Sequence, residues 1–160
     1  MSEDKYLAPY KGLNGRAARL LACEYADRVL HLCSDPRAHA AIEAARAYAV
    51  DEVTRDALEV ARQTATQAVH DADDYAASDP DWAEENCPAW NFAVRAAAAT
   101  TRADAMDAAL TASVYGVFAA VEGADGGSDP HHPIWAAIRA AVDAQEKAWQ
   151  ASRLAEYLNR

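Results

Sequence analysis

The sequence has little glycine, little proline and few large aliphatic side chains. Its 160 residues include six glycines and six prolines, and Leu, Ile, Val and Phe together number only 25. Val and Ile, the β-branched residues of this set, are therefore few, which argues against a β-sheet protein. No apolar run approaches the roughly 18 residues of a membrane span, and residues 1–5 lack the basic and apolar regions of a signal peptide. We therefore expect neither a membrane span nor a secretory signal.

Cysteine is also scarce: only Cys23, Cys33 and Cys87 are present, without a Cys-x-x-Cys spacing. Cys23 and Cys33 lie on one predicted helix at a separation of about 15 Å, which is well beyond the ~7 Å at which a disulfide can form. We therefore expect reduced cysteines and a cytoplasmic location. Cys87 lies in an acidic segment that would raise the pKa of its thiol, so we interpret it as structural rather than nucleophilic.

Alanine is the residue present in excess, at 42 of 160 positions. Few large aliphatic residues and a net charge of −10 would be typical of a disordered chain. The alanines, however, recur at helical spacing and have high helix propensity, so they predict helices. We expect one domain, residues 1–160, folded as a single antiparallel all-α bundle of about five to six helices.

The ends of the helices are predicted from capping and breaking residues. Asp35 can cap a helix whose first position is Pro36, and Thr54 can open the next one. A helix break near Thr100 and Thr101 is one possibility, but because no glycine or proline forces it, we expect one long helix there. The expected helices cover 14–33, 36 to between 51 and 53, 54–78, 88–121 and 134–157. The other segments are an N-terminal arm (1–13), an acidic connector (78–88) and a loop (123–133).

We interpret two embedded arginines and the large apolar residues of these helices as structural. Arg28 and Arg46 are embedded in otherwise apolar helices, so we expect them to snorkel or to pair with carboxylates of a neighbouring helix. The sequence does not identify those partners. The large residues expected to face the core include Trp90, Trp135, Trp149, Val114 and Phe118.

Negative charge is concentrated in the middle of the chain. Residues 63–138 contain twelve acids and two bases, whereas the segments before and after have net charges of −1 and +1. Such a field disfavours nucleic acid as a direct partner. It favours a basic protein partner.

An acidic cluster at 71–85 is the most distinctive feature of this region. Seven carboxylates fall within fifteen residues without a base, and two aromatic residues lie among them. The cluster can be a solvated connector that aids solubility. It can also be a docking surface, on which carboxylates steer a basic partner and an aromatic ring anchors it. The candidate partner-binding residues are Asp71, Asp73, Asp74, Tyr75, Asp79, Asp81, Trp82, Glu84 and Glu85.

Patterns for metal binding and catalysis are weak. A di-iron bundle needs Glu-x-x-His on two helices, and the sequence contains no such motif. We therefore nominate no metal ligand, cofactor or catalytic residue. The alternative is a helical-bundle enzyme or metal protein that uses His31, His39 or His70 with carboxylates, and elemental analysis of the purified protein would detect its metal.

Several segments carry a family resemblance. Ala22-Cys-Glu-Tyr-Ala-Asp-Arg-Val-Leu30, Pro36-Arg37 and Ala41-Ile-Glu-Ala-Ala-Arg-Ala-Tyr-Ala49 resemble the start of immunity proteins of bacterial polymorphic toxin systems, the immunity-protein-5-like group. Gln145-Glu-Lys-Ala-Trp-Gln-Ala-Ser-Arg-Leu154 resembles the closing Glu-x-x-Trp-Gln-x-x-x-Leu pattern of that group, whereas its central Gly-His-Ala type of segment is missing. The resemblance implies an all-helical protein that binds and neutralises a cognate toxin without catalytic residues.

A third possibility is a structural or oligomerising bundle without a toxin partner. The predicted last helix is polar in its C-terminal half, which is compatible with the seam of a homodimer. Light scattering would test that state.

Overall fold

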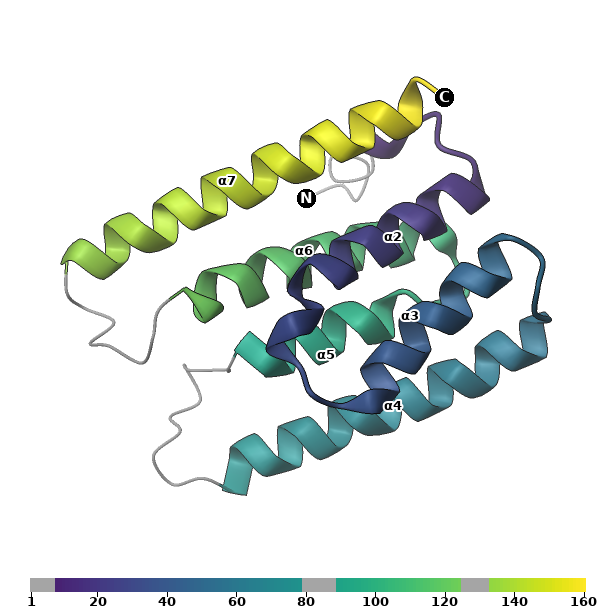
Figure 1. The fold of residues 1–160 in the computed structure, drawn as a ribbon, viewed down its shortest axis with the longest axis horizontal. Helices are drawn as coiled ribbons and strands as arrows, with labels where there is room; N and C mark the ends of the chain where they lie inside the picture. Colours follow the sequence, from purple (N-terminus) through teal and green to yellow (C-terminus); the bar gives the residue numbers. More distant parts are fainter. Residues whose placement is uncertain (1–7, 79–88, 125–132) are drawn as a thin grey trace.

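Most of the residues that the structure describes are helical. This computed structural model describes residues 8–78, 89–124 and 133–160, apart from the side chains of 133–135. Within these ranges it contains six α-helices, two short 3-10 helices and no strand (Figure 1), which confirms the expected all-α bundle. The elements are η1 (Ala8–Tyr10), α2 (Gly15–Val29), η2 (Leu30–Leu32), α3 (Pro36–Ala49), α4 (Arg55–Ser78), α5 (Ala89–Ala99), α6 (Ala105–Gly123) and α7 (Pro133–Leu158).

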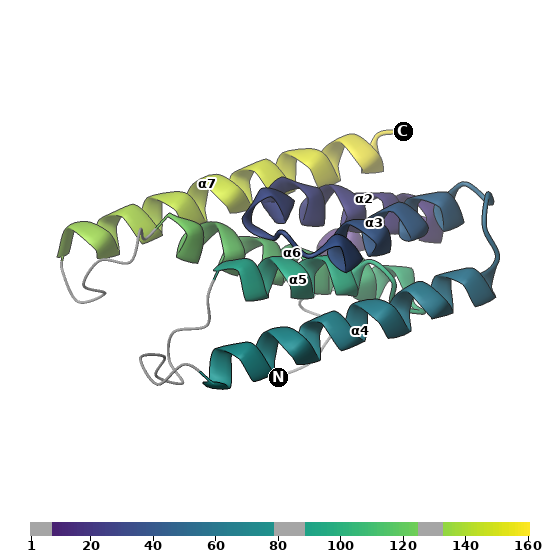
Figure 2. The ribbon, with the colours of Figure 1, turned by 60° about the horizontal axis from the view of Figure 1, so that its bottom comes forward.

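Consecutive α-helices run antiparallel, as predicted, but α2 and α6 run parallel (Figure 1). Gly15 at the start of α2 lies next to Ala105 at the start of α6, and Leu32 just after α2 lies against Gly123 at the end of α6. Helices α4 and α7 lie at opposite edges of the bundle in both views (Figure 2). The two parallel helices therefore begin at one end of the bundle and finish together at the other.

Side-chain caps define where several helices begin. The side chains of Asn14, Asp35 and Asp104 accept a backbone N–H two or three residues further on, each at 2.8 Å, at the starts of α2, α3 and α6. The cap at Asp35 and the position of Pro36 confirm the predicted start of α3. The helix ends two residues before Asp51, whose left-handed φ of 62° turns the chain toward α4.

The single long helix expected across Thr100 and Thr101 is wrong, because α5 ends at Ala99 and α6 begins at Ala105. Both threonine hydroxyls donate at 2.7 Å to the carbonyl three residues earlier, and such bonds compete with helix propagation. Arg19 Nη1 donates to the Thr100 carbonyl at 2.6 Å, and Nη2 donates to the Ala103 carbonyl at 3.1 Å. A side chain from α2 therefore satisfies the backbone where the helix stops.

The contact between α2 and α6 is built from small side chains. Val114 and Phe118 of α6 are 43% and 48% exposed, so the expectation that they face the core is wrong. Small inward side chains let two helices approach closely, and bulky ones would hold them apart. Together with Tyr10 of the N-terminal arm and Leu21, these small side chains form a buried cluster between α2 and α6, which we call the α2–α6 cluster. The buried residues of α6 are Ala108, Ala109, Ala112, Gly116, Val117 and Ala119.

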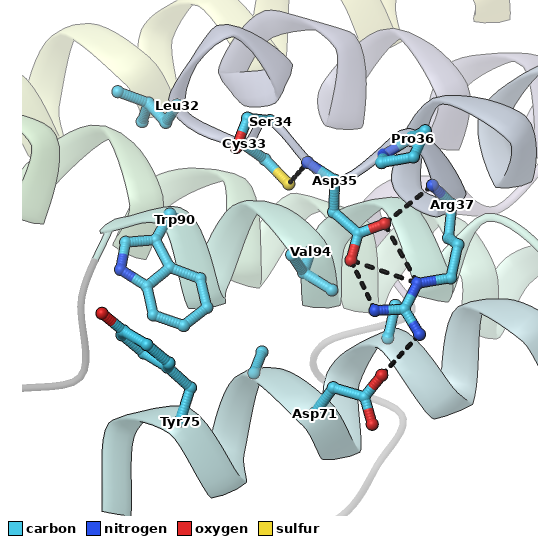
Figure 3. Close-up of a pocket in the computed structure, with 12 residues that line it drawn as sticks. Leu32, Cys33, Ser34, Asp35, Pro36, Arg37, Asp71, Tyr75, Trp90 and Val94 are labelled. Atoms are coloured by element: carbon cyan, nitrogen blue, oxygen red, sulfur yellow. Dashed lines mark hydrogen bonds and ion pairs between the residues drawn. The ribbon is translucent and has the colours of Figure 1, made fainter. Parts of the chain in front are cut away.

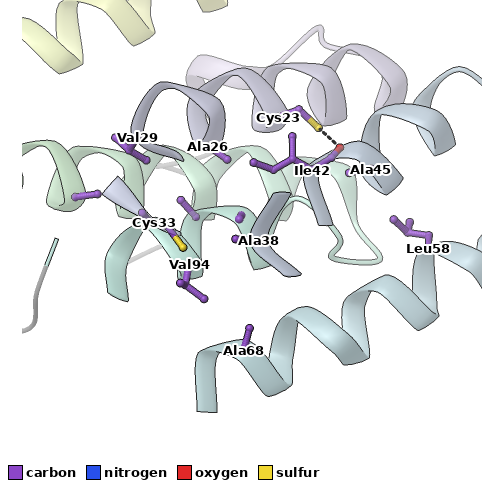
Figure 4. Close-up of a cluster of buried hydrophobic side chains, with 14 residues drawn as sticks. Cys23, Ala26, Val29, Cys33, Ala38, Ile42, Ala45, Leu58, Ala68 and Val94 are labelled. Atoms are coloured by element: carbon purple, nitrogen blue, oxygen red, sulfur yellow. Dashed lines mark hydrogen bonds between the residues drawn. The ribbon is translucent and has the colours of Figure 1, made fainter. Parts of the chain in front are cut away.

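A second buried cluster joins α2, α3, α4 and α5 (Figure 4). Ile42 of α3, Leu58 of α4 and Val94 of α5 are members of this cluster. The Cys23 thiol donates to the Ile42 carbonyl at 3.8 Å. Cys23 and Cys33 are both buried and free, which confirms that they do not form a disulfide.

Helix α6 is, by length and composition alone, the one described helix that could cross a membrane. Its apolar character has an explanation within the bundle, since it packs against α2, α5 and α7. The absence of a membrane span stays a prediction.

The crossing of α2, α6 and α7 yields a first testable prediction. A Cβ on Gly116 would lie 3.4 Å from the Tyr25 carbonyl oxygen and 3.5 Å from Gln150 Nε2. Gly116→Ala therefore fits, and its gain in helix propensity keeps the free energy of unfolding within about 1 kcal/mol of the native value. Gly116→Leu must force helices apart and should lower that free energy by about 3 kcal/mol. Urea unfolding followed by circular dichroism measures both changes.

The exposed Ala144→Leu variant on α7 controls for the added leucine, and its stability should be nearly native. A Gly116→Leu protein as stable as this control would contradict the close approach of the three helices.

Candidate functional site

A groove of about 800 Å³ opens between the α2–α3 connection, α4 and α5; we call it the α4–α5 groove (Figure 3). Its volume is within the range of ligand sites in proteins. One end is aromatic and the other is ionic, with a short apolar floor between them. The lining residues are Leu32, Cys33, Ser34, Asp35, Pro36, Arg37, Ala68, Asp71, Ala72, Tyr75, Trp90 and Val94.

The aromatic end is formed where α4 finishes and α5 starts. Tyr75 lies in the last turn of α4 and is 69% exposed. Its ring centroid is 5.9 Å from that of Trp90 at an interplanar angle of 71°, an edge-to-face contact. Trp90 is partly buried, whereas Tyr75 presents its ring to solvent. The Tyr75 ring is therefore accessible to a partner, and its contact with Trp90 restrains it.

The ionic end is an arginine held between two carboxylates. Arg37 donates from Nη2 to Asp35 Oδ2 at 2.7 Å and from Nη1 to Asp71 Oδ2 at 2.5 Å. Hydrogen bonds from Arg37 lower the pKa of Asp35, and those from Gln67 and Arg37 lower the pKa of Asp71. Both carboxylates are ionised at neutral pH, so this clamp has a net charge of −1.

The thiol on the groove floor is not set up as a nucleophile. Cys33 Sγ accepts the Asp35 backbone N–H at 3.4 Å, yet burial raises the pKa of this thiol. Burial also raises the pKa of Cys23 to about 12. Both thiols therefore stay protonated at neutral pH. Cys87 lies outside the described residues.

The described part of the predicted acidic surface is divided between two roles. Asp73 accepts Arg95 Nη2 at 2.6 Å and Asn91 Nδ2 at 2.9 Å, which ties α4 to α5. Burial raises the pKa of Asp73, but the bonds from Asn91 and Arg95 outweigh it, so the pKa is lowered. Asp71 likewise ties α4 to α3 through Arg37. Of the four described candidates, Asp71, Asp74 and Tyr75 are exposed and Asp73 is partly buried.

The other five predicted partner-binding residues, Asp79, Asp81, Trp82, Glu84 and Glu85, lie outside the described residues. The structure instead adds Asp35, Arg37 and Trp90 to the groove. Sequence reasoning treated Asp35 as a helix cap and Trp90 as core, and it gave Arg37 no role of its own. The signal that could have identified Arg37 was its position two residues after the helix cap Asp35. The Pro36-Arg37 pair is also one of the segments that carry the family resemblance.

The histidines proposed for the metal alternative are exposed and lie on three different elements: His31 on η2, His39 on α3 and His70 on α4. Within residues 8–78, 89–124 and 133–160, no three His, Cys, Asp or Glu side chains could hold a metal ion together. His131 and His132 lie outside these ranges.

Arg28 and Arg46 both pair with carboxylates of a neighbouring helix, which was one of the two arrangements expected for them. Arg28 of α2 donates from Nε to Glu146 of α7 at 2.7 Å, and Arg46 of α3 contacts Asp27 of α2. Trp149 of α7 is partly buried against the α2–α6 cluster. The side chain of Trp135 lies outside the description.

Comparison with models of known families, with curated proteins and with solved structures finds no match to this chain. The family expectation therefore depends on the short sequence motifs alone.

Proposed function

We propose that this chain is a non-enzymatic binding protein that takes a basic protein partner at the α4–α5 groove. The observation that carries the proposal is the exposed ring of Tyr75, which contacts Trp90 at one end of the groove. Asp74, the preceding residue of α4, is also exposed. Aromatic anchors of this kind contribute most of the binding energy in protein interfaces. The clamp of Asp35, Arg37 and Asp71 adds a net negative charge at the other end of the groove.

Charge supports the choice of a basic partner. The chain has a net charge of −10, and residues 63–138, which include most of α4 and all of α5, account for all of it. Such a field accelerates the encounter with a positively charged protein and lowers the probability of binding acidic ones.

The family motifs support a narrower version, in which the partner is a cognate toxin that this chain neutralises by binding. Pro36 and Arg37 of those motifs lie in the groove wall. The others mainly build the scaffold, since Tyr25 on α2 and Gln150 on α7 are buried where these helices meet.

The test uses the double variant Asp74→Lys/Tyr75→Ala and the protein encoded by the neighbouring upstream reading frame, immobilised for interferometry. Binding to the variant should be weaker by about 100-fold, because a charge and a hot-spot ring are lost together. Its association rate should also depend less on salt. Asp73 is left unchanged, because it holds α4 to α5.

Glu52→Lys is the matched control. Glu52 is exposed in the α3–α4 turn, at the far end of a helix about 36 Å long. It makes the same charge change far from Tyr75, so binding should stay within about twofold of native. Equal weakening by both variants would reduce the proposal to a general charge effect, and no weakening by either would reject the groove.

Self-association is a second candidate function, favoured by the exposed apolar side chains of α6. Phe118 is 48% exposed and its ring centroid lies 5.3 Å from that of Phe92. Light scattering of the purified chain would separate a dimer from a monomer.

A further inference from the structure

Asp71 is a carboxylate of the α4–α5 groove that can accept further hydrogen bonds. Its Oδ1 accepts Gln67 Nε2 at 2.8 Å, and its Oδ2 accepts Arg37 Nη1 at 2.5 Å. A carboxylate has about four lone-pair sites, two on each oxygen, so these bonds leave a second site on each oxygen. The side chain is 48% exposed, so a ligand in the groove can reach it.

The ionic end of the groove stays negative after Arg37 has been counted. Asp35 and Asp71 share the guanidinium of Arg37, so two negative charges face one positive charge. Asp35 is only 22% exposed, and both of its oxygens accept bonds from Arg37. Asp74 follows Asp71 by three residues, lies on the same face of α4 and is exposed. An incoming cation therefore meets an excess of negative charge, and Asp71 is the carboxylate that it can contact.

An aromatic surface lies one helical turn from this carboxylate. Tyr75 follows Asp71 by four residues, so the two side chains start about 6 Å apart on one face of α4. Both line the groove, with Val94 between its two ends (Figure 3). The Tyr75 ring is 69% exposed, and its edge contact with Trp90 restrains it. A ligand that contacts both ends needs an apolar stem about one helical turn long with a cation at its tip.

We propose that the α4–α5 groove binds an arginine side chain of the basic partner, an inference that rests on the function proposed above. The guanidinium donates to both oxygens of Asp71, and the methylene stem lies against the Tyr75 ring. Arginine fits better than lysine, because a planar fork matches the two oxygens of a carboxylate and packs on an aromatic face, whereas an ammonium is a compact and strongly hydrated point charge.

The experiment titrates n-butylguanidinium, which has the stem and the charged group of arginine, into the full chain and follows amide chemical shifts. Saturable shifts are expected at Asp71, Ala72 and Tyr75 and at the indole N–H of Trp90, with a dissociation constant on the order of 10 mM. n-Butylammonium lacks the fork and should bind about fivefold more weakly. The neutral n-butylurea should give no saturable shift.

Two variants assign the site to its residues. Asp71→Asn removes the charge and one acceptor oxygen, so the affinity for n-butylguanidinium should fall at least about fivefold. Asp56→Asn is the matched control, because Asp56 is an exposed acid in the first turn of α4, about 22 Å away, and its affinity should be native. Asp71 also contacts Arg37, so Tyr75→Leu serves as a variant that leaves this ion pair intact. It should weaken binding about threefold through loss of the ring face.

Three results would overturn the proposal: no saturable shift at the groove, equal binding of n-butylammonium or n-butylurea, or native affinity in either folded variant.

The interferometry assay with the protein of the upstream reading frame separates this inference from the proposed function. Both stand if n-butylguanidinium binds at the groove and displaces that protein at saturation. If Asp74→Lys/Tyr75→Ala loses the protein but n-butylguanidinium never binds, the arginine inference fails and the proposed function stands. If n-butylguanidinium binds while the double variant keeps native affinity for the protein, the arginine site stands and the proposed function fails.

Discussion

Replacing Tyr25 by alanine is expected to lower the free energy of unfolding by about 4 kcal/mol. The ring is 1% exposed and meets the Trp149 ring edge-to-face at 6.0 Å. Its hydroxyl donates to the Gln150 carbonyl at 3.2 Å, and burial raises the pKa of this phenol, so it stays a neutral donor. The neighbours are mainly alanines of α2 and α6, whose short side chains cannot fill the space left by the ring.

Urea unfolding of three tyrosine variants tests this expectation. Tyr25→Phe keeps the ring and removes the hydroxyl, so it should cost about 1 kcal/mol. Tyr75→Ala removes an exposed tyrosine and its edge contact with Trp90, and should lower the free energy of unfolding by only about 1 kcal/mol. Equal losses in Tyr25→Phe and Tyr25→Ala would show that the hydrogen bond, rather than the ring, stabilises this crossing.

Arg19→Met is expected to lower the free energy of unfolding by about 3 kcal/mol. Arg19 is 3% exposed, and its guanidinium binds the carbonyls of Thr100 and Ala103 between α5 and α6. Burial lowers the pKa of the guanidinium, which records the cost of keeping this charge inside. Methionine removes that cost but leaves two carbonyls without donors, and the second effect is the larger.

Arg16→Met is the matched control, because Arg16 is exposed three residues earlier on α2 and should contribute within about 0.5 kcal/mol. Arg19→Lys should fall between the two, because an ammonium lacks the planar fork that reaches both carbonyls. Amide hydrogen exchange at 100–105 should accelerate in Arg19→Met alone. Native protection there would contradict the assignment of Arg19 as the cap of this junction.

The features that were predicted correctly depend on residues close together in the chain. The start of α3 follows from Asp35 and Pro36, because a cap and the first helical position are local choices. The spacing of the alanines, another local feature, predicted the helices correctly. The absence of a Cys23–Cys33 disulfide follows from the rise of a helix alone.

The features that were missed depend on residues far apart in the chain. Thr100 looks like an interior helix residue until Arg19, 81 positions away, binds its carbonyl. Val114 and Phe118 look like core residues until α2 packs against the alanine face of α6 instead. In both cases the partner lies on another helix, and local pattern does not say which face a helix turns toward its neighbours.

The acidic cluster shows the same division within a candidate site. Its charge is visible in the sequence, but only the tertiary structure decides that Asp71 and Asp73 hold α4 to its neighbours while Asp74 and Tyr75 face solvent. By itself the sequence determined that the chain is helical, packed through alanines and strongly acidic in its middle. Helix propensity, residue spacing and local charge depend only on residues that are close together in the chain. The parallel pairing of α2 and α6, the α4–α5 groove and the contact of Arg37 with Asp71 were decided by the tertiary structure, because each arises only where distant segments meet.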